Sequence, residues 1–537
     1  MTALFFNNLY LSLNEIVLFR KQLYMAKKIL WVDDEIALLK PHIIFLESKG
    51  YEVVPVQSGL EALDELSQNH FDIVFLDEHM PGLDGLETLK RLKAKHMQIP
   101  VVMITKSEEE NIMEEAIGEQ ITDYIIKPVN PKQILLSLKK ILNKKELVSE
   151  KTNLSYQQDF QRISMDISMI QSPNEWMDMY RRLVKWAIKM DDIKDTQMQE
   201  ILKSQFQEAN RAFFKFVKNN YEDWVNGGED APVLSPDILK NFVFSKIDSP
   251  VLLVVIDNLR YDQWLTIAPI INEYYRIAQE EMYYAILPTA TQYARNSIFS
   301  GLMPLDIKKY YPQWWKDDPE EGGKNLFEKD LLTAQLKRLN LPYKLNYIKI
   351  LNYHFGQKII SQFGRFKNYD LNVVVYNFVD MLSHAKTDLD LIKELAPDDK
   401  AYRSLTRSWF ENSPLLELIK LAAQNGMKLM ITTDHGAINV KKPTKVIGQK
   451  DTSLNLRYKT GRSLTYEKKD VYAVKQPGNI KLPSVGINSP YIFAKEDYFF
   501  VYPNDYNKYV EYFTDTLQHG GISMQEMLVP FVYLTPR

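Results

Sequence analysis

The chain has 537 residues, which is enough for about three or four domains of ~150 residues each. Hydrophobic residues make up 45% of the sequence and charged residues 25%, values that are ordinary for a globular protein. The formal net charge of −3 excludes a general affinity for nucleic acid, so any polyanion must be bound by a local basic patch. There are no cysteines, which excludes disulfides and thiolate metal sites.

The first 24 residues are apolar but are interrupted by Asn7, Asn8, Asn14 and Glu15, and their positive charges follow the apolar part. This order is the reverse of a secretory signal peptide. Met25 is followed at once by the sequence KKILWVDDE, which has the form of a domain start. We therefore expect residues 1–24 to be a non-native or disordered extension. No apolar run reaches the ~18 residues that span a bilayer, so a cytoplasmic protein is expected.

Residues 25–147 alternate strand-like and helical patterns with short connections. The predicted strands are Ile29–Val32, Val53–Pro55, Ile73–Leu76, Val101–Ile104 and Tyr124–Ile126. Five such units predict a doubly wound (βα)5 domain with one parallel sheet.

Residues 148–245 lack strand-like runs and instead show helical spacing of apolar residues. Ser172, Pro173 and Glu175 form the pattern of a capping box at a helix start. We predict a linker bundle of about three helices. Residues 246–537 return to alternating strands and helices, which predicts a larger α/β domain.

Polar residues follow four of the five strands predicted in the first domain. They are Asp33, Asp34, Asp77, Thr105 and Lys127. Because parallel strands end at one sheet edge, we expect these side chains to meet. Asp33, Asp34, Asp77 and the backbone carbonyl of His79 form an oxygen-only ligand set suited to Mg²⁺. Asp77 can then accept a phosphoryl group, with Lys127 and Thr105 contacting its oxygens.

This pattern, together with the MPGLDG segment at Met80–Gly85, resembles the receiver domain of bacterial response regulators. The resemblance implies phosphorylation of Asp77 by a sensor histidine kinase. It also implies a switch made of Thr105, Tyr124 and Lys127, and a homodimer that forms on phosphorylation.

A second set of metal-type ligands is scattered over the carboxy-terminal half. Its members are Asp257, Thr291, Asp380, His384, Asp434, His435 and His519. Three of the acids follow apolar strand-like runs, which would bring them to the carboxyl ends of a parallel sheet. Carboxylates, imidazoles and a hydroxyl nucleophile in one place are suited to two-metal phosphoryl-transfer chemistry.

The order of these residues resembles the alkaline phosphatase superfamily, and the opening VVIDNLRYDQW at Val254–Trp264 resembles its PglZ branch. The resemblance implies one metal held by Asp380, His384 and His519. It implies a second metal held by Asp257, Asp434, His435 and Thr291. Mixed imidazole and carboxylate ligands favour two Zn²⁺, with Mn²⁺ as the second choice. Thr291 is the expected nucleophile, and Thr289 of the same P-T-A-T segment is its rival.

Substrate contacts are less sharply defined by the sequence. The stretch from Lys441 to Lys469 has nine basic residues against two acids, which predicts either a polyanion-binding loop or a solvated one. Arg457, Lys459 and Arg462 are its best candidates for substrate binding. Arg260 is a further candidate for a phosphate contact, with a surface ion pair as the alternative.

A receiver joined through helices to a PglZ-type domain resembles the PorX-like response regulators, which are associated with type IX secretion and gliding. The resemblance implies a zinc-dependent phosphodiesterase that acts on nucleotides or oligonucleotides, with a secretion-motor protein or a sigma factor as a further partner. One alternative is a non-catalytic signalling adaptor that binds those partners. A phosphomonoesterase is the other alternative.

Overall fold

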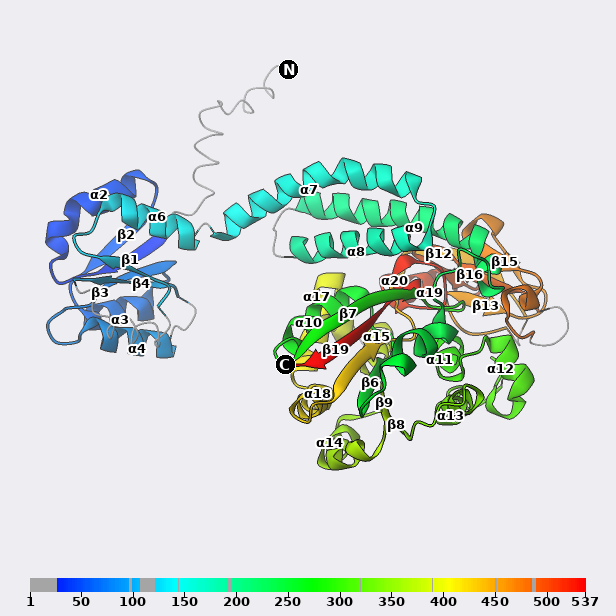
Figure 1. The fold of residues 1–537 in the computed structure, drawn as a ribbon. Coiled ribbons are helices and arrows are strands. Elements are labelled where there is room, and N and C mark those ends of the chain that lie inside the picture. Colours follow the sequence, from blue (N-terminus) through cyan, green and yellow to red (C-terminus); the bar gives the residue numbers. More distant parts are fainter. Residues whose placement is uncertain are drawn as a thin grey trace, which may run out of the picture. The chain divides into compact units, whose positions relative to one another are not determined.

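The computed structural model describes residues 27–95, 99–106, 121–142, 144–191, 196–318, 320–388, 390–449, 452–484 and 489–537. The chain divides into two compact units, Met1–Thr152 and Asn153–Arg537 (Figure 1). The predicted extension over residues 1–24 lies outside the described residues and stays a prediction. In the part of the chain that is described, no helix is both long enough and apolar enough to cross a bilayer.

The first unit is a five-stranded parallel sheet in the order β2-β1-β3-β4-β5. Its strands are β1 (Lys28–Val32), β2 (Glu52–Val56), β3 (Ile73–Asp77), β4 (Val101–Thr105) and β5 (Asp123–Ile126). Its helices include α2 (Lys40–Ser48), α3 (Gly59–Gln68), α4 (Gly85–Lys95) and α6 (Pro131–Leu142). Successive residues of β1 alternate between two apolar clusters, one on each sheet face. The prediction of a doubly wound domain is confirmed.

Three long helices lead into the second unit: α7 (Lys144–Met169), α8 (Pro173–Met190) and α9 (Thr196–Val225). The capping box predicted at Ser172 starts α8. Arg182 and Trp186 of α8 both donate hydrogen bonds to Asp159 of α7. The helices also contact the α/β core, since the Tyr284 hydroxyl donates to the Pro173 carbonyl at 2.9 Å. The boundaries predicted at residues 147 and 245 stay predictions.

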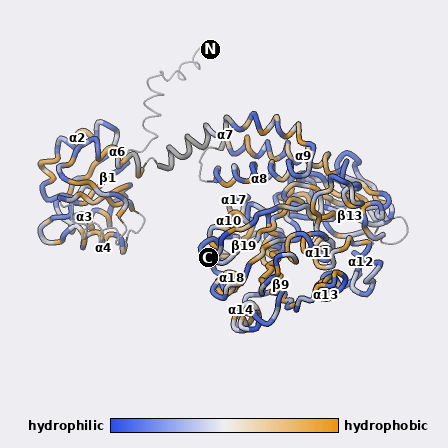
Figure 2. Tube along the Cα trace, viewed as in Figure 1, coloured by the Kyte–Doolittle hydropathy of each residue, from blue (hydrophilic) through white to orange (hydrophobic). Residues whose placement is uncertain are grey.

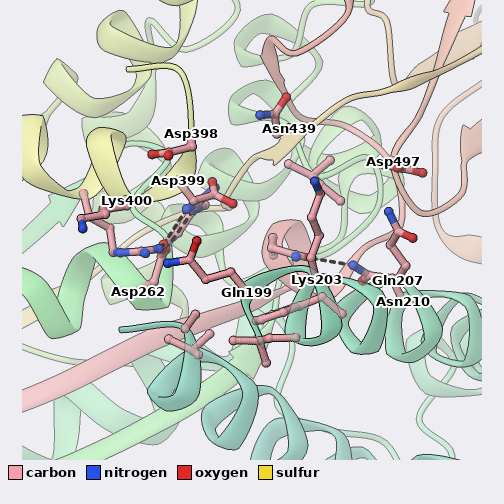
Figure 3. Close-up of a pocket in the computed structure, with 18 of the residues that line it drawn as sticks. Gln199, Lys203, Gln207, Asn210, Asp262, Asp398, Asp399, Lys400, Asn439 and Asp497 are labelled. Atoms are coloured by element: carbon pink, nitrogen blue, oxygen red, sulfur yellow. Dashed lines mark hydrogen bonds and ion pairs between the residues drawn. The ribbon is translucent and has the colours of Figure 1, made fainter. Parts of the chain in front are cut away.

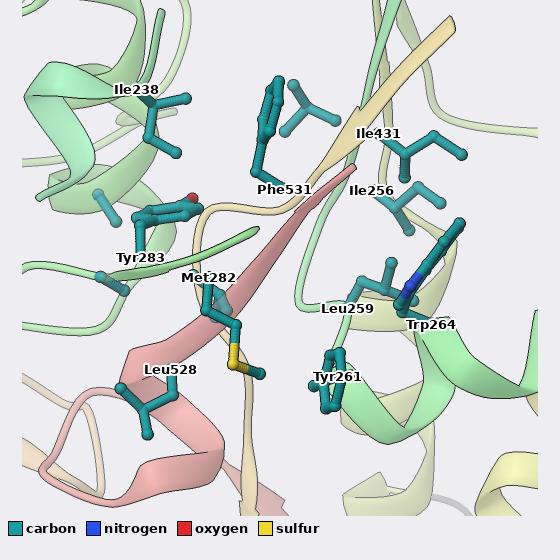
Figure 4. Packing of buried hydrophobic residues seen from close by; sticks show 14 of the residues in the cluster. Ile238, Ile256, Leu259, Tyr261, Trp264, Met282, Tyr283, Ile431, Leu528 and Phe531 are labelled. Carbon is teal, nitrogen blue, oxygen red and sulfur yellow. The ribbon is translucent and has the colours of Figure 1, made fainter. Parts of the chain in front are cut away.

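The core of the second unit is a six-stranded sheet in the order β7-β19-β10-β6-β9-β8. Its strands are β6 (Val251–Ile256), β7 (Tyr275–Tyr284), β8 (Leu345–Ile350), β9 (Leu371–Tyr376), β10 (Lys428–Thr432) and β19 (Leu528–Pro536). Strands β10, β6, β9 and β8 are parallel, whereas β19 runs antiparallel to both its neighbours. Ile256 of β6, Ile431 of β10 and Phe531 of β19 belong to one apolar cluster (Figure 4).

Helices flank this sheet, and its buried strands are its most apolar segments, as the hydropathy along β9 shows (Figure 2). The helices of this part of the chain are α10 (Tyr261–Ile271), α11 (Thr291–Ser300), α12 (Pro304–Tyr310), α13 (Glu328–Arg338), α14 (Tyr353–Ser361), α15 (Phe378–Asp388), α16 (Asp390–Leu395), α17 (Asp399–Glu411), α18 (Pro414–Gln424), α19 (Tyr506–Phe513), which packs on a small sheet, and α20 (Met524–Met527). Strands that are buried on both faces read as continuous apolar runs, which explains why β6, β9 and β10 stand out in the sequence.

Between β10 and β19 the chain forms small sheets that the sequence reading did not predict. They contain β11 (Ile438–Asn439), β12 (Lys442–Ile447), β13 (Tyr458–Thr460), β14 (Thr465–Tyr466), β15 (Val471–Val474), β16 (Tyr491–Ala494), β17 (Tyr498–Val501) and β18 (Leu517–Gln518). The basic stretch that was predicted as a loop therefore contains three strands. Side chains of β12 alternate between the inside and the outside, as in any strand: Thr444 and Val446 are buried, and Lys445 between them is exposed. The many lysines made this alternation hard to recognise in the sequence.

Candidate metal centre and phospho-acceptor site

In the first unit the predicted acidic residues lie together at the carboxyl ends of the strands. Carboxylate oxygens of Asp33, Asp34 and Asp77 lie within 4.8 Å of one another. Lys127 reaches this group from the end of β5, with its Nζ 2.9 Å from Asp77 Oδ1 and 3.1 Å from Asp33 Oδ2. Asp33 and Asp77 are buried and Asp34 is exposed.

The electrostatics of this group fit a divalent cation. Burial raises the pKa of Asp77, Lys127 lowers it, and the nearby charges of Asp33 and Asp34 raise it, so the net pKa is raised. Burial lowers the pKa of Lys127, but its two carboxylate partners outweigh burial and raise it. Asp33 and Asp77 thus share one ammonium group beside a third carboxylate, Asp34, and an oxygen-only set of this kind suits Mg²⁺.

The predicted switch residues have defined positions. Thr105 Oγ1 donates a hydrogen bond to Glu78, the residue after Asp77, and this partner was missed by the sequence reading. The Tyr124 side chain is 44% exposed and therefore turned toward solvent. The His79 side chain is exposed, and a role for its backbone carbonyl as a ligand stays a prediction. Beside it lies a pocket of about 390 Å³ lined by Glu78, His79, Met80, Pro81, Asp84 and Leu86.

In the second unit, three strand ends deliver the acids that the sequence singled out. Asp257 follows β6 and Asp434 lies two residues beyond β10. Asp380 and His384 lie one turn apart on α15, which follows β9. Because β10, β6 and β9 are adjacent and parallel, all these residues reach one edge of the sheet.

The first group of ligand-type residues surrounds Thr291. Asp257, Asp434 and His435 are buried, with ligand atoms within 4.8 Å of one another. Thr291 Oγ1 lies 3.3 Å from Asp257 Oδ1 and 3.1 Å from His435 Nε2. His435 Nδ1 lies 3.1 Å from the Gly436 carbonyl oxygen. Since a carbonyl can only accept, Nδ1 carries the proton and Nε2 presents a free lone pair.

The second group consists of Asp380, His384 and His519, again with ligand atoms within 4.8 Å of one another. His519 Nδ1 lies 3.1 Å from the Thr289 carbonyl oxygen, so this ring too leaves its Nε2 unprotonated. The rings of His435 and His519 stack with their centroids 4.3 Å apart. The two groups therefore adjoin each other.

These groups have the properties of a site for divalent metal ions. Burial lowers the pKa of both His435 and His519 to about 4, so both imidazoles are neutral near pH 7. Burial, followed by the charge of Asp257, raises the pKa of Asp434 well above its usual range. The buried Asp434 Oδ2 also has no hydrogen-bond partner among the described residues. A set of carboxylate and neutral imidazole donors fits Zn²⁺, with Mn²⁺ as the second choice.

Arg295 is a central residue that the sequence reading missed. It is 1% exposed, and its Nη1 lies 2.7 Å from Asp257 Oδ2 and 3.6 Å from Asp434 Oδ2. Its Nε donates to Glu328 at 2.5 Å. Burial raises the pKa of Asp257, but Arg295 and then His435 outweigh burial, so this pKa is lowered. The signal in the sequence was its position four residues after Thr291, on the same face of α11.

The geometry separates the two threonines of the P-T-A-T segment. The Thr289 hydroxyl is buried, donates to the Gly521 carbonyl at 3.0 Å and accepts from the Gly520 amide at 3.0 Å. It supports the segment that carries His519. Thr291, at the first position of α11, is the threonine whose hydroxyl faces the ligand-type residues.

Arg260 does not have the position expected of a phosphate contact. It is 3% exposed, and its guanidinium donates two hydrogen bonds to Asp262 and one to Asp399. Arg403 joins the same network through Asp262 and Asp191. The network borders a pocket of about 430 Å³ between α8, α9 and the α/β core (Figure 3). Carboxylates occupy the donors of Arg260, which corrects the substrate-binding prediction. The alternative, an ion pair, is confirmed, although Arg260 itself is buried.

Two of the other predicted substrate residues are also buried. Arg457 is fully buried and donates two hydrogen bonds to Glu526, at 3.1 and 2.6 Å. Lys459 is 1% exposed, and its Nζ donates to the Ser453 carbonyl at 2.7 Å. Lys459 lies in β13, which pairs with β16, and Arg457 directly precedes this strand. Both side chains are buried, which corrects their prediction as substrate ligands. Arg462 is exposed, and its role stays a prediction.

Comparison with protein families identifies all three parts of the chain. Residues 29–139 match the response regulator receiver domain, and residues 146–225 match the PorX response regulator linker domain. Residues 239–534, more than half of the chain, match the BREX system PglZ alkaline phosphatase-like domain. The chain belongs to the PglZ family. Its three matched parts give the PorX-like architecture, a receiver joined through a linker to a PglZ output domain.

Individual relatives cover a smaller part of the chain. The alkaline phosphatase synthesis transcriptional regulatory protein PhoP of Bacillus subtilis is 33% identical over 24% of this chain and 54% of its own length. Transcriptional regulatory protein SrrA of Staphylococcus aureus is 31% identical over 22% of this chain and 49% of its own. The chain thus spans about half the length of these relatives. A CheY-like receiver domain protein from Methanospirillum hungatei is 29% identical, with 23% of this chain and 98% of that chain covered and a TM-score of 0.22.

The family matches establish the domain composition of this PglZ-family chain. The amino-terminal part is a response regulator receiver domain. The carboxy-terminal part is an alkaline phosphatase-like domain of the PglZ family.

Proposed function

We propose that this chain is a response regulator, phosphorylated on Asp77, whose output domain is a two-zinc phosphodiesterase with Thr291 as its nucleophile. Mn²⁺ is the alternative metal. The observation that carries the proposal is the position of Thr291 Oγ1. It lies 3.3 Å from Asp257 and 3.1 Å from His435, beside the two adjoining groups of ligand-type residues.

Each residue of the output site has a role in this proposal. Asp380, His384 and His519 would hold one ion, whereas Asp257, Asp434, His435 and Thr291 would hold the other. Bound divalent ions supply positive charge that stabilises an alkoxide and the phosphoryl oxygens. Thr291 Oγ1 loses its proton and forms a bond to phosphorus as the bond to the leaving oxygen breaks, and that oxygen takes up a proton and leaves as an alcohol. Water then attacks the same phosphorus, which releases a phosphomonoester and restores the Thr291 hydroxyl. The amino end of α11 favours the negative charge that Thr291 carries in between.

The signalling part of the proposal rests on the PorX-like architecture. Phosphorylation by a sensor histidine kinase favours a homodimer that places the output domain for its task. The substrates are nucleotides or oligonucleotides, and the chain regulates type IX secretion and gliding. A secretion-motor protein or a sigma factor is a further partner.

The test compares hydrolysis of bis-p-nitrophenyl phosphate and p-nitrophenyl phosphate by zinc-loaded wild type and Thr291→Ala. We expect the diester to be cleaved faster than the monoester and the substitution to lower the diester rate about 10³-fold or more. Thr289→Ser serves as the matched control, because it keeps the hydroxyl that supports the His519 segment. This control is expected to retain most of the rate.

Three results would contradict the proposal in different ways. Diester hydrolysis that is unchanged in Thr291→Ala would exclude this nucleophile. A faster monoester rate would identify a phosphomonoesterase. Absence of any metal-dependent hydrolysis would favour a signalling adaptor whose output acts by binding other proteins.

A further inference from the structure

A groove with an excess of positive charge lies between α9 and the small sheets of the second unit. Its volume is about 650 Å³, within the range of binding pockets. It is lined by Arg211, Phe214, Lys215, Lys218, Asn219, Lys442, Lys469, Lys495, Glu496 and Tyr498. Six of these residues are cationic, whereas Glu496 is the one acid. We call this the α9 groove.

Most of the positive charge in the α9 groove is not neutralised by the protein. Lys442 pairs with Asp497 at 3.0 Å, and Lys495 pairs with Asp470 at 3.4 Å. The other four cations have no ion pair with any described residue, and all four are exposed. They are Arg211, Lys215, Lys218 and Lys469. Their charge is therefore available to an anionic ligand.

The neighbouring pocket near Arg260 shows the contrast. It is lined by some of the same helix, α9, and also contains several cations (Figure 3). There Lys203 pairs with Glu200 at 3.1 Å, Lys441 with Asp515 at 3.9 Å and Arg403 with Asp191 at 2.6 Å. The positive charges of that pocket are neutralised by nearby carboxylates, whereas most of those in the α9 groove are not.

The α9 groove is directly connected to the segment that carries His519. Lys495 forms a parallel bridge with Ile522, three residues after His519. Three residues span at most about 11 Å. Asn210, the residue before Arg211, accepts a hydrogen bond from the Met524 amide at 2.8 Å. The backbone that carries His519 therefore also forms contacts with the wall of the groove.

We propose that the α9 groove binds the phosphate backbone of a single-stranded oligonucleotide. This inference rests on the proposed phosphodiesterase function, and it specifies strands of several phosphates as the substrate class. Arg211, Lys215 and Lys218 are four and three residues apart on α9, so they form a row about 10 Å long. That length corresponds to about three phosphate-to-phosphate steps at the ~3.4 Å axial spacing of a stacked strand.

The lining favours a nucleic acid strand over an acidic peptide. Phosphates on a strand are regularly spaced and attract both guanidinium and ammonium groups. Tyr498 of the groove lining is partly exposed, with Lys442 and Lys495 over its ring, whereas Phe214 is buried. A strand offers base faces to an aromatic ring such as that of Tyr498. A poly-glutamate peptide provides similar charge but no such faces.

The test measures binding of a fluorescein-labelled oligothymidylate of about 15 nucleotides to the full chain by fluorescence polarisation. All proteins carry Thr291→Ala so that a bound strand is not cut. The test variant is Lys215→Glu/Lys218→Glu. The matched control, Lys337→Glu/Lys358→Glu, changes the charge equally at exposed positions on α13 and α14 outside the groove.

We expect the groove variant to bind at least about tenfold more weakly at about 50 mM salt, and the control to change by less than about twofold. The slope of log K against log salt should fall by about 1.4 in the groove variant, since each lost phosphate contact removes about 0.7. Lys215→Gln/Lys218→Gln should give a smaller loss of the same kind, which guards against misfolding of the charge-reversed protein.

Equal losses in the groove variant and the control, or no loss in either, would overturn the proposal. So would competition by poly-glutamate as strong as that of unlabelled oligothymidylate. Because binding is measured without turnover, the two proposals fail separately. Groove-dependent binding by a wild type without hydrolysis would sink the enzyme proposal alone, and hydrolysis without groove-dependent binding would sink this one alone.

Discussion

The receiver cluster and the output cluster both gather carboxylates at the carboxyl ends of parallel strands, but they balance the charge differently. In the receiver, Asp33 and Asp77 share the ammonium group of Lys127, whose side chain remains 14% exposed. In the output domain, Asp257 and Asp434 share the guanidinium group of Arg295, which is 1% exposed. The receiver site contains only oxygen donors, whereas the output site adds imidazoles.

This difference follows from the two nucleophiles. Asp77 is a carboxylate and needs no base to become an anion, so a hard cation and a lysine suffice. Thr291 has a hydroxyl, which must lose its proton before it can attack. A site with neutral imidazoles and buried carboxylates can hold metal ions of the kind that make this possible near pH 7.

Replacing Asp77 should give the largest effect. In Asp77→Ala we expect complete loss of phosphoryl incorporation from acetyl phosphate with Mg²⁺, because the acceptor oxygen is gone. Incorporation is measured by phosphate-affinity electrophoresis and dimer formation by size-exclusion chromatography. Thr291→Ala is the control and should be phosphorylated normally. Dimerisation of Asp77→Ala to the same extent as wild type would contradict the proposed switch.

Replacing Arg295 should destabilise the output domain, because this side chain neutralises two buried carboxylates. Arg295→Met leaves Asp257 and Asp434 buried without their cation, which costs about 3–5 kcal/mol of unfolding free energy in chelated protein. Zinc should recover much of this loss, because bound cations replace the missing positive charge. The measurement is denaturant unfolding with chelator or with zinc. A loss that is the same in both conditions would show that the carboxylates do not hold metal.

The sequence predicted the ligand-type residues better than the substrate contacts, for a physical reason. Asp257 and Asp434 follow continuous apolar strands, and parallel strands place their ends together whatever the rest of the fold does. The positions of Arg457 and Lys459 instead depend on pairing of β13 with β16, about thirty residues further along the chain. Isolated basic residues give no local sign of such pairing.

Arg260 and Arg295 also show that contacts between residues far apart in the sequence are hard to predict from it. The partner of Arg260 across the network is Asp399, 139 residues later in the chain, and no spacing rule connects them. Arg295 did have a local signal, its position one turn after Thr291 on α11. A buried arginine within one turn of a candidate nucleophile is therefore worth including among site residues.

Replacing Thr289 should have an intermediate effect, on zinc affinity, because Thr289 positions the segment that carries the metal ligand His519. Thr289→Val removes the hydroxyl that contacts Gly520 and Gly521, so the His519 segment loses two hydrogen bonds. We expect zinc affinity to fall about 10- to 100-fold, as for other residues that orient metal ligands. Affinity is measured by competition with a chromogenic chelator. Thr289→Ser should bind zinc normally, and an unchanged affinity in Thr289→Val would remove this supporting role.

The smallest effect at pH 7 is expected at Lys459, where the dependence of stability on pH is more informative than its value at one pH. Burial lowers the pKa of Lys459 to about 7, whereas in the unfolded chain it has the usual lysine value. Above pH 7 the unfolded chain therefore binds the proton that the folded protein has lost. Stability due to Lys459 rises with pH from about 7 to about 10.5, and it is lost again as the pH falls through that range.

Lys459→Met should remove this slope of up to about 1.4 kcal/mol per pH unit. At pH 7 the change should be within about 1 kcal/mol, because relief from burying a charge offsets the lost hydrogen bond to Ser453. Denaturant unfolding between pH 7 and 10 measures both values. Arg462→Met is the matched control, since its exposed side chain should leave the profile unchanged. An equally steep profile in Lys459→Met would mean that Lys459 is charged and solvated, as a substrate ligand would be.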